Sequence, residues 1–455
     1  MSEPLPDAPA AATPQVSFAE ALRFWFKLGL ISFGGPAGQI AIMHRVLVEE
    51  RRWVSEGRFL HALNYCMVLP GPEAQQLATY LGWLMHRTRG GIAAGALFVL
   101  PSLLLLMGLS ALVVRFGDTA TVQAVFYGVK PAVVVLVAAA AWRLGRATLK
   151  SGVTLAIAVA AFAAVSLGLP FPAVLAAAAA TGWLAQRLRW PGFDTVSSAA
   201  NAHTGKRTAH VPGVSYLIDD DTAPPPHAQA SLARTLRVLA GGVLLALAAW
   251  GAVWAVWGHG VFTDLGAFFT RAALVTFGGA YAVLPYVTQQ AVEHYHWLSA
   301  PQMIDGLALG ESTPGPLIII VAYVGFLGGA HQGGWAQPLA AGAVGACVAT
   351  FFTFLPSFIF IFAGAPWIEH TRRNIALHAP LRAISAAVVG VIVSLALYFA
   401  THVFWVQGRV EWGAVGIAVL AALMQFRWRW GVVRLVLACA ALGACYIALS
   451  TYCFT

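Results

Sequence analysis

Long apolar runs separated by short polar or basic breaks occupy most of the chain between residues 20 and 450. A run of about 20 mainly apolar residues is long enough to cross a bilayer as a helix. The first half holds six such segments, near 20–48, 58–86, 92–115, 122–142, 152–168 and 171–187. A single segment follows near 234–257, and six more lie near 265–291, 302–328, 336–363, 381–402, 411–426 and 431–450. The pattern predicts an all-α polytopic membrane protein with about thirteen transmembrane helices.

Composition agrees with this fold class and narrows the alternatives. Of the 455 residues, 59% are apolar and 10% are charged, whereas a soluble domain has roughly half apolar and a quarter charged residues. A water-soluble enzyme of this length would need far more charge to cover its surface. The same figures exclude collagen-like and disordered classes.

Two polar stretches lie outside the apolar segments. Residues 1–19 form a Pro/Ala-rich tail that has no basic region followed by an apolar stretch, so we expect a disordered tail and no cleavable signal peptide. Residues 190–233 contain three aspartates at 219–221 and three prolines at 224–226, which is typical of a flexible linker.

Basic residues set the expected orientation, because cytoplasmic loops of membrane proteins are rich in lysine and arginine. With the N-terminus inside, the inner loops hold sixteen basic residues and five acids, the latter being Asp194, Asp219, Asp220, Asp221 and Glu369. The expected outer loops hold Arg51, Arg52, Arg58, Arg115 and Arg409. The net charge of +9 therefore reflects topology and not nucleic-acid binding. The Arg51–Arg52 pair is the exception to the bias.

The chain contains an internal repeat. Residues 24–72 match residues 268–316 at a constant offset of 244, with identical Phe-Gly-Gly, Trp-x-Ser and Pro-Gly-Pro punctuation. Further on, Leu-Pro-Ser at 100–102 corresponds to Leu-Pro-Ser at 355–357, and Lys130 aligns with Arg382 after small gaps. We therefore predict a duplicated six-span unit.

The odd span between the units determines their relative orientation. We expect a first repeat over 20–189, a cytoplasmic linker over 190–233, a connecting helix over 234–257 and a second repeat over 258–455. Because each unit crosses the membrane an even number of times, the connecting helix inverts the second repeat relative to the first. Inverted repeats are a recurring architecture of secondary transporters; the alternative is a structural duplication without transport.

Each repeat is interrupted twice within its apolar segments. The first interruption is SFGGPAGQ at 32–39, echoed by TFGGAYAV at 276–283, and the second is MVLPGPEAQQ at 67–76, echoed by ESTPGPLIII at 311–320. Glycine pairs and prolines break helices, so we expect half-helices with unwound backbone between them. The residues assigned to these structural breaks are Pro36, Pro70, Pro72, Pro314 and Pro316. The sequence leaves open whether the broken segments cross the membrane or re-enter.

Half-helix N-termini inside a membrane protein point to an anion site, because the free N–H groups and the helix dipole attract negative charge. The alternative is that the breaks are kinks that only shape the bundle. The candidate oxyanion-binding residues are Lys27, Ser32, Gly34, Gly35, Gln39, Arg45, Gly71, Gln75, Gln76, Arg271, Thr276, Gly278, Gly279, Ser312, Thr313 and Gly315. A carboxylate at a helix N-terminus competes with an anionic substrate for the same positive potential, so it either caps its own helix or must be protonated when the anion binds. Glu73, Glu311 and His44 are the candidate proton-coupling residues.

These motifs resemble the chromate ion transporter family in its long, two-domain form. The residues that carry the resemblance are FGGPAGQIAIMH at 33–44, LPGPEAQQLATYLGW at 69–83, FGGAYAVLPYVTQQAV at 277–292 and ESTPGPLIIIVAYVGF at 311–326. The resemblance implies a secondary transporter of the bacterial inner membrane that exports chromate and confers chromate resistance. It also implies that sulfate is a structural analogue of the substrate and that the two halves are oppositely oriented. Serine at 312 is a mild departure, where the family pattern has threonine.

The membrane potential favours efflux. At 100 mV, negative inside, the export of each elementary negative charge is favourable by about 2.3 kcal/mol, and a dianion carries two. A sulfate or other oxyanion importer on the same scaffold is the main alternative, and a membrane-embedded enzyme or channel is a third. No HExxH, GxGxxG or GxxxxGK[ST] motif is present, so we expect no enzyme activity, no cofactor and no metal site. The expected partners are a chromate- or sulfate-type oxyanion and membrane lipid, with the N-terminus cytoplasmic and the C-terminus periplasmic. The oligomeric state, a homodimer included, stays open.

Overall fold

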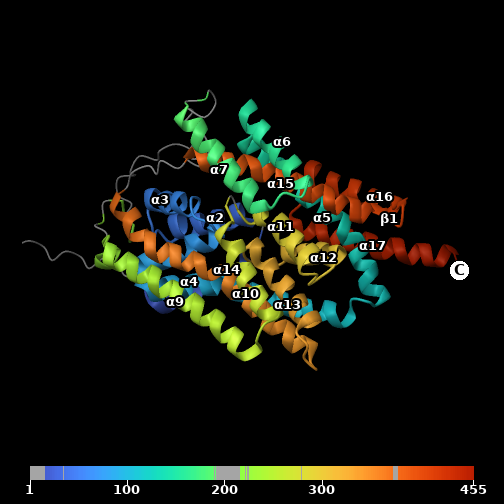
Figure 1. Ribbon diagram of the computed structural model, residues 1–455, viewed down its shortest axis with the longest axis horizontal. Helices are drawn as coiled ribbons and strands as arrows, with labels where there is room; N and C mark the ends of the chain where they lie inside the picture. Colours follow the sequence, from blue (N-terminus) through green and yellow to red (C-terminus); the bar gives the residue numbers. More distant parts are fainter. Residues whose placement is uncertain are drawn as a thin grey trace, which may run out of the picture.

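The structure is a computed structural model that describes residues 16–33, 35–188, 190, 216–220, 222, 225–277, 279–371 and 378–454. Nearly all of this part of the chain is helical (Figure 1). Six helical stretches are long and apolar enough to span a membrane: Glu73–Phe116, Ala120–Thr148, Leu232–Trp257, Pro338–Glu369, Ala379–Phe404 and Val432–Ser450. Shorter apolar helices accompany them at Gly152–Ser166, Leu317–Gln332 and Trp412–Arg427. The prediction of an all-α membrane-embedded protein is therefore confirmed.

The first half contains seven α-helices and one π-helical segment among the described residues. They are α1 (Phe18–Ile31), α2 (Gly35–His44) with η1 (Arg45–Glu50), α3 (Glu56–Cys66), α4 (Glu73–Phe116), α5 (Ala120–Thr148), α6 (Gly152–Ser166) and α7 (Phe171–Arg187). A short 3-10 turn, η2 (Pro226–Ala228), precedes the connecting helix α9 (Leu232–Trp257).

The second half repeats this order. Its elements are α10 (Val261–Leu274), α11 (Ala280–Thr288) with η3 (Gln289–His294), α12 (Ala300–Ser312), η4 (Leu317–Ile319), α13 (Ile320–Gln332), α14 (Pro338–Thr371), α15 (His378–Phe404), α16 (Trp412–Ala422) with η5 (Leu423–Arg427), and α17 (Val432–Phe454). The strands β1 (Trp405–Val406) and β2 (Arg409–Val410) form a small antiparallel hairpin between α15 and α16.

The first broken segment is a helical hairpin. The chain leaves α1 at Ile31, reverses, and returns along α2 and η1. Its returning end lies beside its starting end, because Arg51 forms an ion pair with Glu20 at 2.9 Å and the Trp53 ring packs against Phe24 at 5.5 Å. The segment near 20–48 therefore does not run straight through the molecule.

The second broken segment is also a hairpin. Arg58 at the start of α3 and Tyr80 on α4 both bind the carboxylate of Glu369, so the two arms lie side by side. The chain reverses again within α4, at His86 and Arg87, where the backbone φ and ψ angles are not helical. The two arms of α4 touch closely, since a Cβ on Gly82 would lie 2.5 Å from the carbonyl oxygen of Gly90.

The second half contains the same two hairpins. The Trp297 ring packs against Phe268 at 5.7 Å, as Trp53 packs against Phe24. Helices α13 and α14 correspond to the two arms of α4 and also meet along small residues. A Cβ on Gly325 would lie 2.4 Å from the carbonyl oxygen of Gly345.

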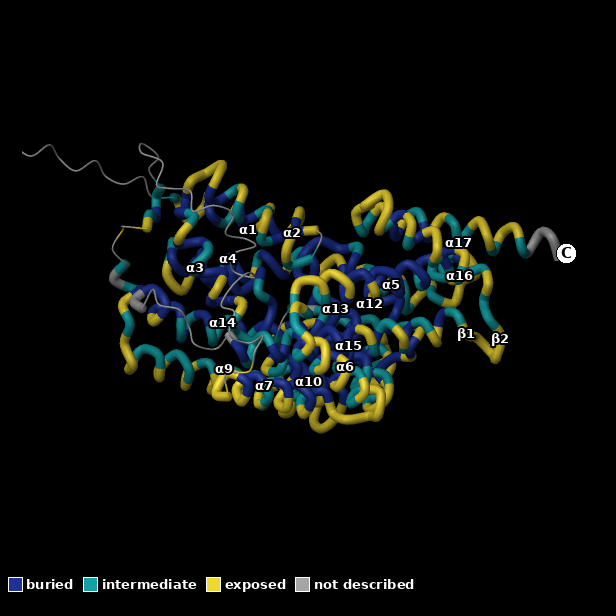
Figure 2. Tube along the Cα trace, turned by 90° about the horizontal axis from the view of Figure 1, so that it is seen from above, coloured by how far each residue is buried: buried dark blue, intermediate teal, exposed yellow. Residues whose placement is uncertain are grey.

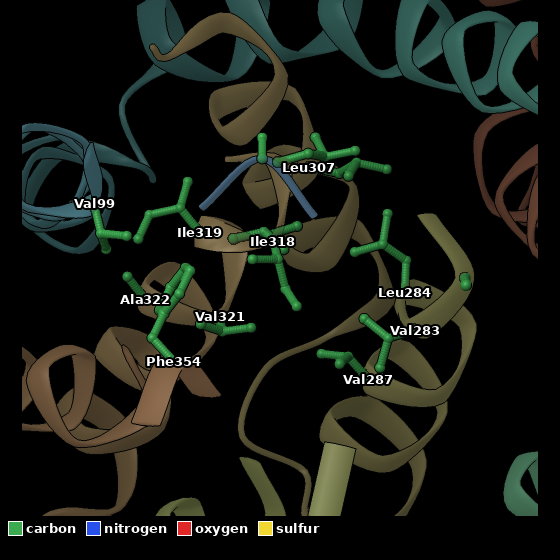
Figure 3. Close-up of a cluster of buried hydrophobic side chains, with 14 of the residues drawn as sticks. Val99, Val283, Leu284, Val287, Leu307, Ile318, Ile319, Val321, Ala322 and Phe354 are labelled. Atoms are coloured by element: carbon green, nitrogen blue, oxygen red, sulfur yellow. The ribbon is translucent and has the colours of Figure 1, made fainter. Parts of the chain in front are cut away.

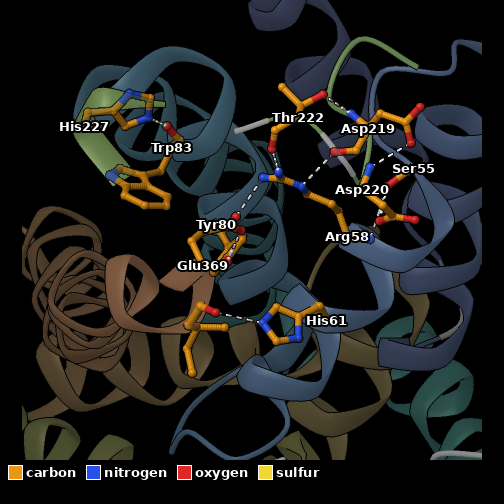
Figure 4. A network of polar contacts seen from close by, with 11 residues as sticks. Ser55, Arg58, His61, Tyr80, Trp83, Asp219, Asp220, Thr222, His227 and Glu369 are labelled. Carbon is orange, nitrogen blue, oxygen red and sulfur yellow. Dashed lines mark hydrogen bonds and ion pairs between the residues drawn. The ribbon is translucent and has the colours of Figure 1, made fainter. Parts of the chain in front are cut away.

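The linker makes direct contact with the hairpins of the first half. Residues 217 and 218 pair with residues 52–55 as a short strand, with a parallel bridge between Val54 and Ile218. Ser55 Oγ donates to Asp220 Oδ1 at 2.7 Å, and Arg58 Nε donates to the carbonyl oxygen of Asp219 at 3.0 Å (Figure 4).

The expectation that Arg51, Arg52 and Arg58 lie on the opposite side from the linker and Glu369 is therefore wrong. Arg58 NH1 lies 2.8 Å from Glu369 Oε2, and both side chains are buried, at 6% and 5% exposed. The physical reason is that the hairpins return the chain to the side from which it entered. The Arg51–Arg52 pair thus lies beside the linker.

The remaining helices surround this centre. Helices α5, α6 and α7 of the first half pack against α15 of the second, and α5 also packs against α17. The trace is mostly buried through the middle of the molecule and exposed along α9 (Figure 2), on which Val253 is the buried residue. An apolar, outward-facing helix such as α9 is suited to contact lipid.

Candidate functional site

Four chain reversals meet near the centre of the molecule. They lie between α1 and α2, between α3 and α4, between α10 and α11, and between α12 and η4, and we call them the four tips. The Gly71 N–H donates to the carbonyl oxygen of Thr276 at 2.7 Å, and the Gly315 N–H donates to that of Ser32 at 2.8 Å. These two bonds correspond to each other at the offset of 244. Each Pro-Gly-Pro tip of one half is thereby joined to the glycine-rich tip of the other.

Glycine is required at Gly71 and Gly315 for two reasons. Their φ angles are +124° and +106°, in the region that residues with a Cβ rarely adopt. A Cβ would also lie 2.4 Å from Ser357 Oγ at Gly71 and 1.7 Å from Ser102 Oγ at Gly315. These two serines belong to the repeated Leu-Pro-Ser motifs, so they too are related by the repeat.

Buried polar atoms without partners gather at the tips. Within the described residues, no hydrogen bond reaches these atoms: Ser32 Oγ, Gln39 Oε1, Gln75 Oε1, Gln76 Oε1 and Ser102 Oγ. All five side chains are completely buried. A buried polar atom without a partner costs about 1–3 kcal/mol and calls for an explanation such as a ligand.

The amide nitrogens of these glutamines hold the tips in place. Gln39 Nε2 donates to the carbonyl oxygens of Ser32, at 3.3 Å, and Gly315. Gln76 Nε2 donates to the carbonyl oxygen of Pro70 at 2.7 Å. Because a glutamine amide can rotate to exchange its oxygen and nitrogen, these side chains can offer either donors or acceptors to a ligand.

The helix ends at the tips add further donors. Helix α4 begins at Glu73 after Pro72, and α11 begins at Ala280 after Gly279, in each case without a side-chain cap. Pro36 is the second residue of α2, and Pro316 precedes η4. Uncapped N-terminal N–H groups favour an anion.

The two halves differ in the chemistry of their tips. Gln39, Gln75, Gln76 and Thr79 of the first half correspond, at the offset of 244, to Val283, Ile319, Ile320 and Tyr323 of the second. Ile318 and Ile319 instead pack in an apolar cluster with Val283, Leu284 and Leu307 (Figure 3). The polar side chains at the centre therefore come mainly from the first half.

Two carboxylates lie beside the tips. Glu73 is the first residue of α4 and is half-buried, and within the described residues it forms no hydrogen bond or ion pair. Glu311 is 9% exposed and accepts a hydrogen bond from the Tyr281 hydroxyl. The charge of Arg143 on α5 also acts on Glu311 and Tyr281.

Three hydroxyl groups that the sequence singled out bind their own helices. Thr276 Oγ1 donates to the carbonyl oxygen of Ala272 at 2.6 Å, Ser312 Oγ to that of Leu309 at 3.1 Å, and Thr313 Oγ1 to that of Gly310 at 3.1 Å. Their hydroxyl hydrogens are therefore engaged, whereas Ser32 Oγ has no hydrogen-bond partner within the described residues. Gly34 and Gly278 lie outside the described residues.

The cationic candidates do not join the tips. Lys27, Arg45 and Arg271 have exposed side chains; Arg45 lies 3.6 Å from Glu50, and Arg271 Nε donates to the carbonyl oxygen of Ala267 at 3.1 Å. His44 is at the far end of α2, where it binds Glu56 at 2.7 Å and Glu49 at 3.2 Å. The spacing of residues along the sequence does not show which face of each helix is exposed, so it could not show that these three side chains are exposed.

Sequence reasoning missed Ser102 and Ser357 as tip residues and Arg58, Tyr80 and Glu369 as a buried network. For the serines, the repeated Leu-Pro-Ser was the available signal. For the network no signal existed, because Glu369 is separated from Arg58 by 311 positions.

The chain is similar in sequence to known proteins. A family model described as chromate transporter matches residues 19–183 and again residues 263–444. The chromate transport protein of Pseudomonas aeruginosa is 31% identical over 428 residues, which cover 92% of this chain and 89% of that protein. The chromate transport protein of Cupriavidus metallidurans is 27% identical over 426 residues, covering 93% and 92%.

A probable chromate transport protein of Synechococcus elongatus is 29% identical over 381 residues, which cover 83% of this chain and 84% of that protein. No solved structure matches the chain.

Proposed function

The chain belongs to the chromate transporter family, and from this premise we propose that it exports chromate from the bacterial cytoplasm by secondary transport. The substrate is a tetrahedral dianion for which sulfate is the analogue. The observation that carries the proposal is the pairing of the tips across the two halves, beside buried polar atoms for which the described part of the chain provides no partner. Chromate resistance of the cell would follow from efflux.

The binding chemistry follows from the donors at the tips. The donors available at or beside the tips are the hydroxyl groups of Ser32 and Ser102, the rotatable amides of Gln75 and Gln76, and the uncapped N-terminus of α4. Together they replace the hydration of an oxyanion without a side-chain cation. Glu73 at this N-terminus repels a dianion unless it is protonated, so its protonation couples anion binding to pH.

The proposed membrane topology follows from the hairpins. Each half contributes two re-entrant hairpins and four full crossings, and α9 adds one crossing, so nine crossings and four hairpins replace the thirteen spans expected from the sequence. Four is still an even number, so α9 still inverts the second half. The recurrence of the family match at residues 19 and 263 supports the duplication on which this topology rests, because the two starts are separated by the same 244 positions.

This topology also improves the charge bias. Arg51, Arg52 and Arg58 move to the inner side, which leaves Arg115 and Arg409 as the outer arginines. A stronger excess of inner basic residues supports a cytoplasmic N-terminus and a periplasmic C-terminus in the inner membrane.

Direction is tested in everted vesicles from cells that make the protein. Energised vesicles are expected to accumulate labelled chromate, less so with excess sulfate or after the proton gradient is collapsed. Absence of accumulation would refute export. If right-side-out vesicles accumulate sulfate and everted vesicles accumulate no chromate, the protein is instead an oxyanion importer.

A matched pair of serines on α4 tests the site itself. Ser102 and Ser110 are both completely buried, but Ser110 Oγ donates to the carbonyl oxygen of Leu106 at 2.6 Å, whereas Ser102 Oγ has no partner in the described part of the chain. Removing a buried hydroxyl without a partner does not destabilise the fold. Ser102→Ala is therefore expected to weaken chromate transport while Ser110→Ala leaves it intact, and equal transport by both variants would remove Ser102 from the site.

A further inference from the structure

A second group of ionisable residues lies away from the tips, where α5, α12 and α13 meet. Asp305 is in the second turn of α12 and is 8% exposed. Lys130 on α5 approaches it, and Tyr323 on α13 is completely buried beside α12. The ring of Tyr323 comes so close that a Cβ on Gly306 would lie 2.2 Å from it.

The contacts of this group are incomplete. Lys130 Nζ lies 3.6 Å from Asp305 Oδ1, which is longer than the 2.7–2.9 Å of a charge-assisted hydrogen bond. Among the described residues, Asp305 Oδ1 and the Tyr323 hydroxyl have no hydrogen-bond partner. The carboxylate is therefore held near a positive charge without being locked to it.

Few other charges act on Asp305. Helix α12 packs against α4, α5, α13, α15 and α17. Among the described residues, Lys130 forms an ion pair with Asp305, and the charge of Asp305 acts on the Tyr323 hydroxyl. Protonation of Asp305 would thus weaken its ion pair with Lys130.

The acid and the tyrosine of this group are present in one half only, whereas Lys130 has Arg382 as its repeat partner. At the offset of 244, Asp305 corresponds to His61 and Tyr323 to Thr79. The His61 ring binds the carbonyl oxygen of Ile368 at 2.9 Å, and Thr79 binds Gln75. A feature that the duplicated fold itself required would recur in both halves, so the fold does not account for this acid.

Helix α12 connects the group to the anion site. Asp305 and the tip at 313–316 belong to the same short helix and its end, and Gly315 at this tip binds Ser32 across the molecule. The Lys130 side chain is 28% exposed, whereas that of Asp305 is 11% exposed. Ionisable residues inside a membrane protein are costly and usually functional.

We infer that Asp305 is a proton-binding site of the transport cycle, with Lys130 as its counter-charge when the carboxylate is ionised. In one state Asp305 takes a proton from the aqueous phase, the ion pair with Lys130 opens and α12 is released from α5. In the other state the proton returns to water and the pair re-forms. The inference rests on the proposed function, because the proton is coupled to movement of the anion at the tips.

The experiment uses the full chain reconstituted in liposomes that contain a pH-sensitive dye, with the membrane potential clamped. Chromate influx and chromate-dependent proton movement are recorded together, and chromate–chromate exchange is recorded separately. The wild-type protein is expected to move both chromate and protons. Absence of any chromate flux in the wild type would refute the proposed function itself, whereas chromate flux without proton movement would overturn the inference about Asp305.

The variants separate a coupling role from a structural one. Asp305→Asn is expected to lose chromate-dependent proton movement and to retain exchange, while Asp264→Asn, the same change at an exposed position of α10, retains both. The double variant Lys130→Gln/Asp305→Asn removes the pair without leaving an unpaired charge. Exchange without proton movement in the double variant supports the inference, and recovery of full proton coupling would overturn it.

Discussion

Gly71 and Gly315 set the geometry of the tips at the scale of single residues. Both have positive φ angles, and at both a Cβ would collide with a serine hydroxyl from the other half. These glycines therefore allow two backbones to approach closely at the centre of the molecule, where the anion is proposed to bind.

Gly315→Ala is expected to reduce chromate transport about tenfold or more, because a strained backbone costs about 1–3 kcal/mol and each 1.4 kcal/mol is a factor of ten. Gly108→Ala is the matched control, since a Cβ at Gly108 meets no atom within 4 Å and its φ is not positive. Initial rates of chromate uptake in everted vesicles, normalised to the amount of inserted protein, provide the measurement. Equal rates for the two variants would show that the tip tolerates a side chain.

Glu73→Gln is expected to make chromate binding tighter at neutral pH and less dependent on pH. The substitution removes a negative charge from the N-terminus of α4, which otherwise competes with the anion for the same positive potential. Chromate dissociation constants of the purified protein measured across a range of pH test this. An unchanged pH profile would remove Glu73 from the coupling mechanism.

Sequence reasoning succeeded at the tips for residues whose role is in the backbone. Gly71, Gly315 and the prolines beside them could be recognised because the same Pro-Gly-Pro sequence interrupts both repeats at the same spacing. The side chains of Lys27 and Arg271 are exposed and, within the described residues, lie in no contact with the tips that would support their assignment, so their role in anion binding stays a prediction. The direction in which a side chain leaves a broken helix depends on how its two arms pack, and residue spacing does not record that.

At the scale of secondary-structure elements, the main features are the helical hairpins and the contacts that hold them in place. Helix α1 has 14 residues and α3 has 11, and each is followed by a second arm that returns beside it. The breaks between the arms could be predicted from the sequence. The sequence pattern of two apolar segments with a break between them is the same whether the chain continues across the membrane or turns back. The arginines at 51 and 52, on the wrong side of the expected topology, were the signal that it reverses.

The Arg58–Tyr80–Glu369 network fastens the second hairpin of the first half to the end of α14. Arg58 NH1 and the Tyr80 hydroxyl both bind the Glu369 carboxylate, and Arg58 also donates to the linker carbonyl oxygens of Asp219 and Thr222 (Figure 4). Helix α3, helix α4, helix α14 and the linker are thereby joined at one point.

Glu369→Ala is expected to destabilise the protein by about 3–5 kcal/mol, because it leaves the buried guanidinium of Arg58 without its counter-charge. The midpoint of thermal unfolding in detergent should fall clearly. Glu411→Ala, at a half-buried position beside the β1–β2 hairpin, is the control and should change the midpoint little. Similar midpoints for both variants would contradict the network's role.

The whole molecule is organised by the reciprocal contacts between its halves. Gly71 binds Thr276 and Gly315 binds Ser32, while α5, α6 and α7 of one half pack against α15 of the other. Neither half therefore completes its own tips. The duplication was visible in the sequence, but the crossing over of its contacts was not, because a repeat specifies which positions are equivalent and not which positions touch.

The two topologies predict opposite sides for one pair of equivalent residues. Glu50 and His294 are separated by 244 positions, are both exposed and end η1 and η3. Straight spans would place Glu50 outside and His294 inside, whereas hairpins place Glu50 inside and His294 outside. The distinction does not depend on knowing the substrate or the direction of transport.

Single cysteines at these positions, on a background without the five native cysteines, decide between the topologies through a membrane-impermeant maleimide. His294→Cys is expected to react in spheroplasts, in which the inner membrane is intact. Glu50→Cys is expected to react only in everted vesicles. The reason is that a hairpin returns each loop to the side from which its first arm entered. Asp118→Cys and Lys150→Cys serve as references, since both topologies place Asp118 outside and Lys150 inside. Reaction of Glu50→Cys in spheroplasts together with protection of His294→Cys would restore the straight spans and remove the geometric basis of the four tips.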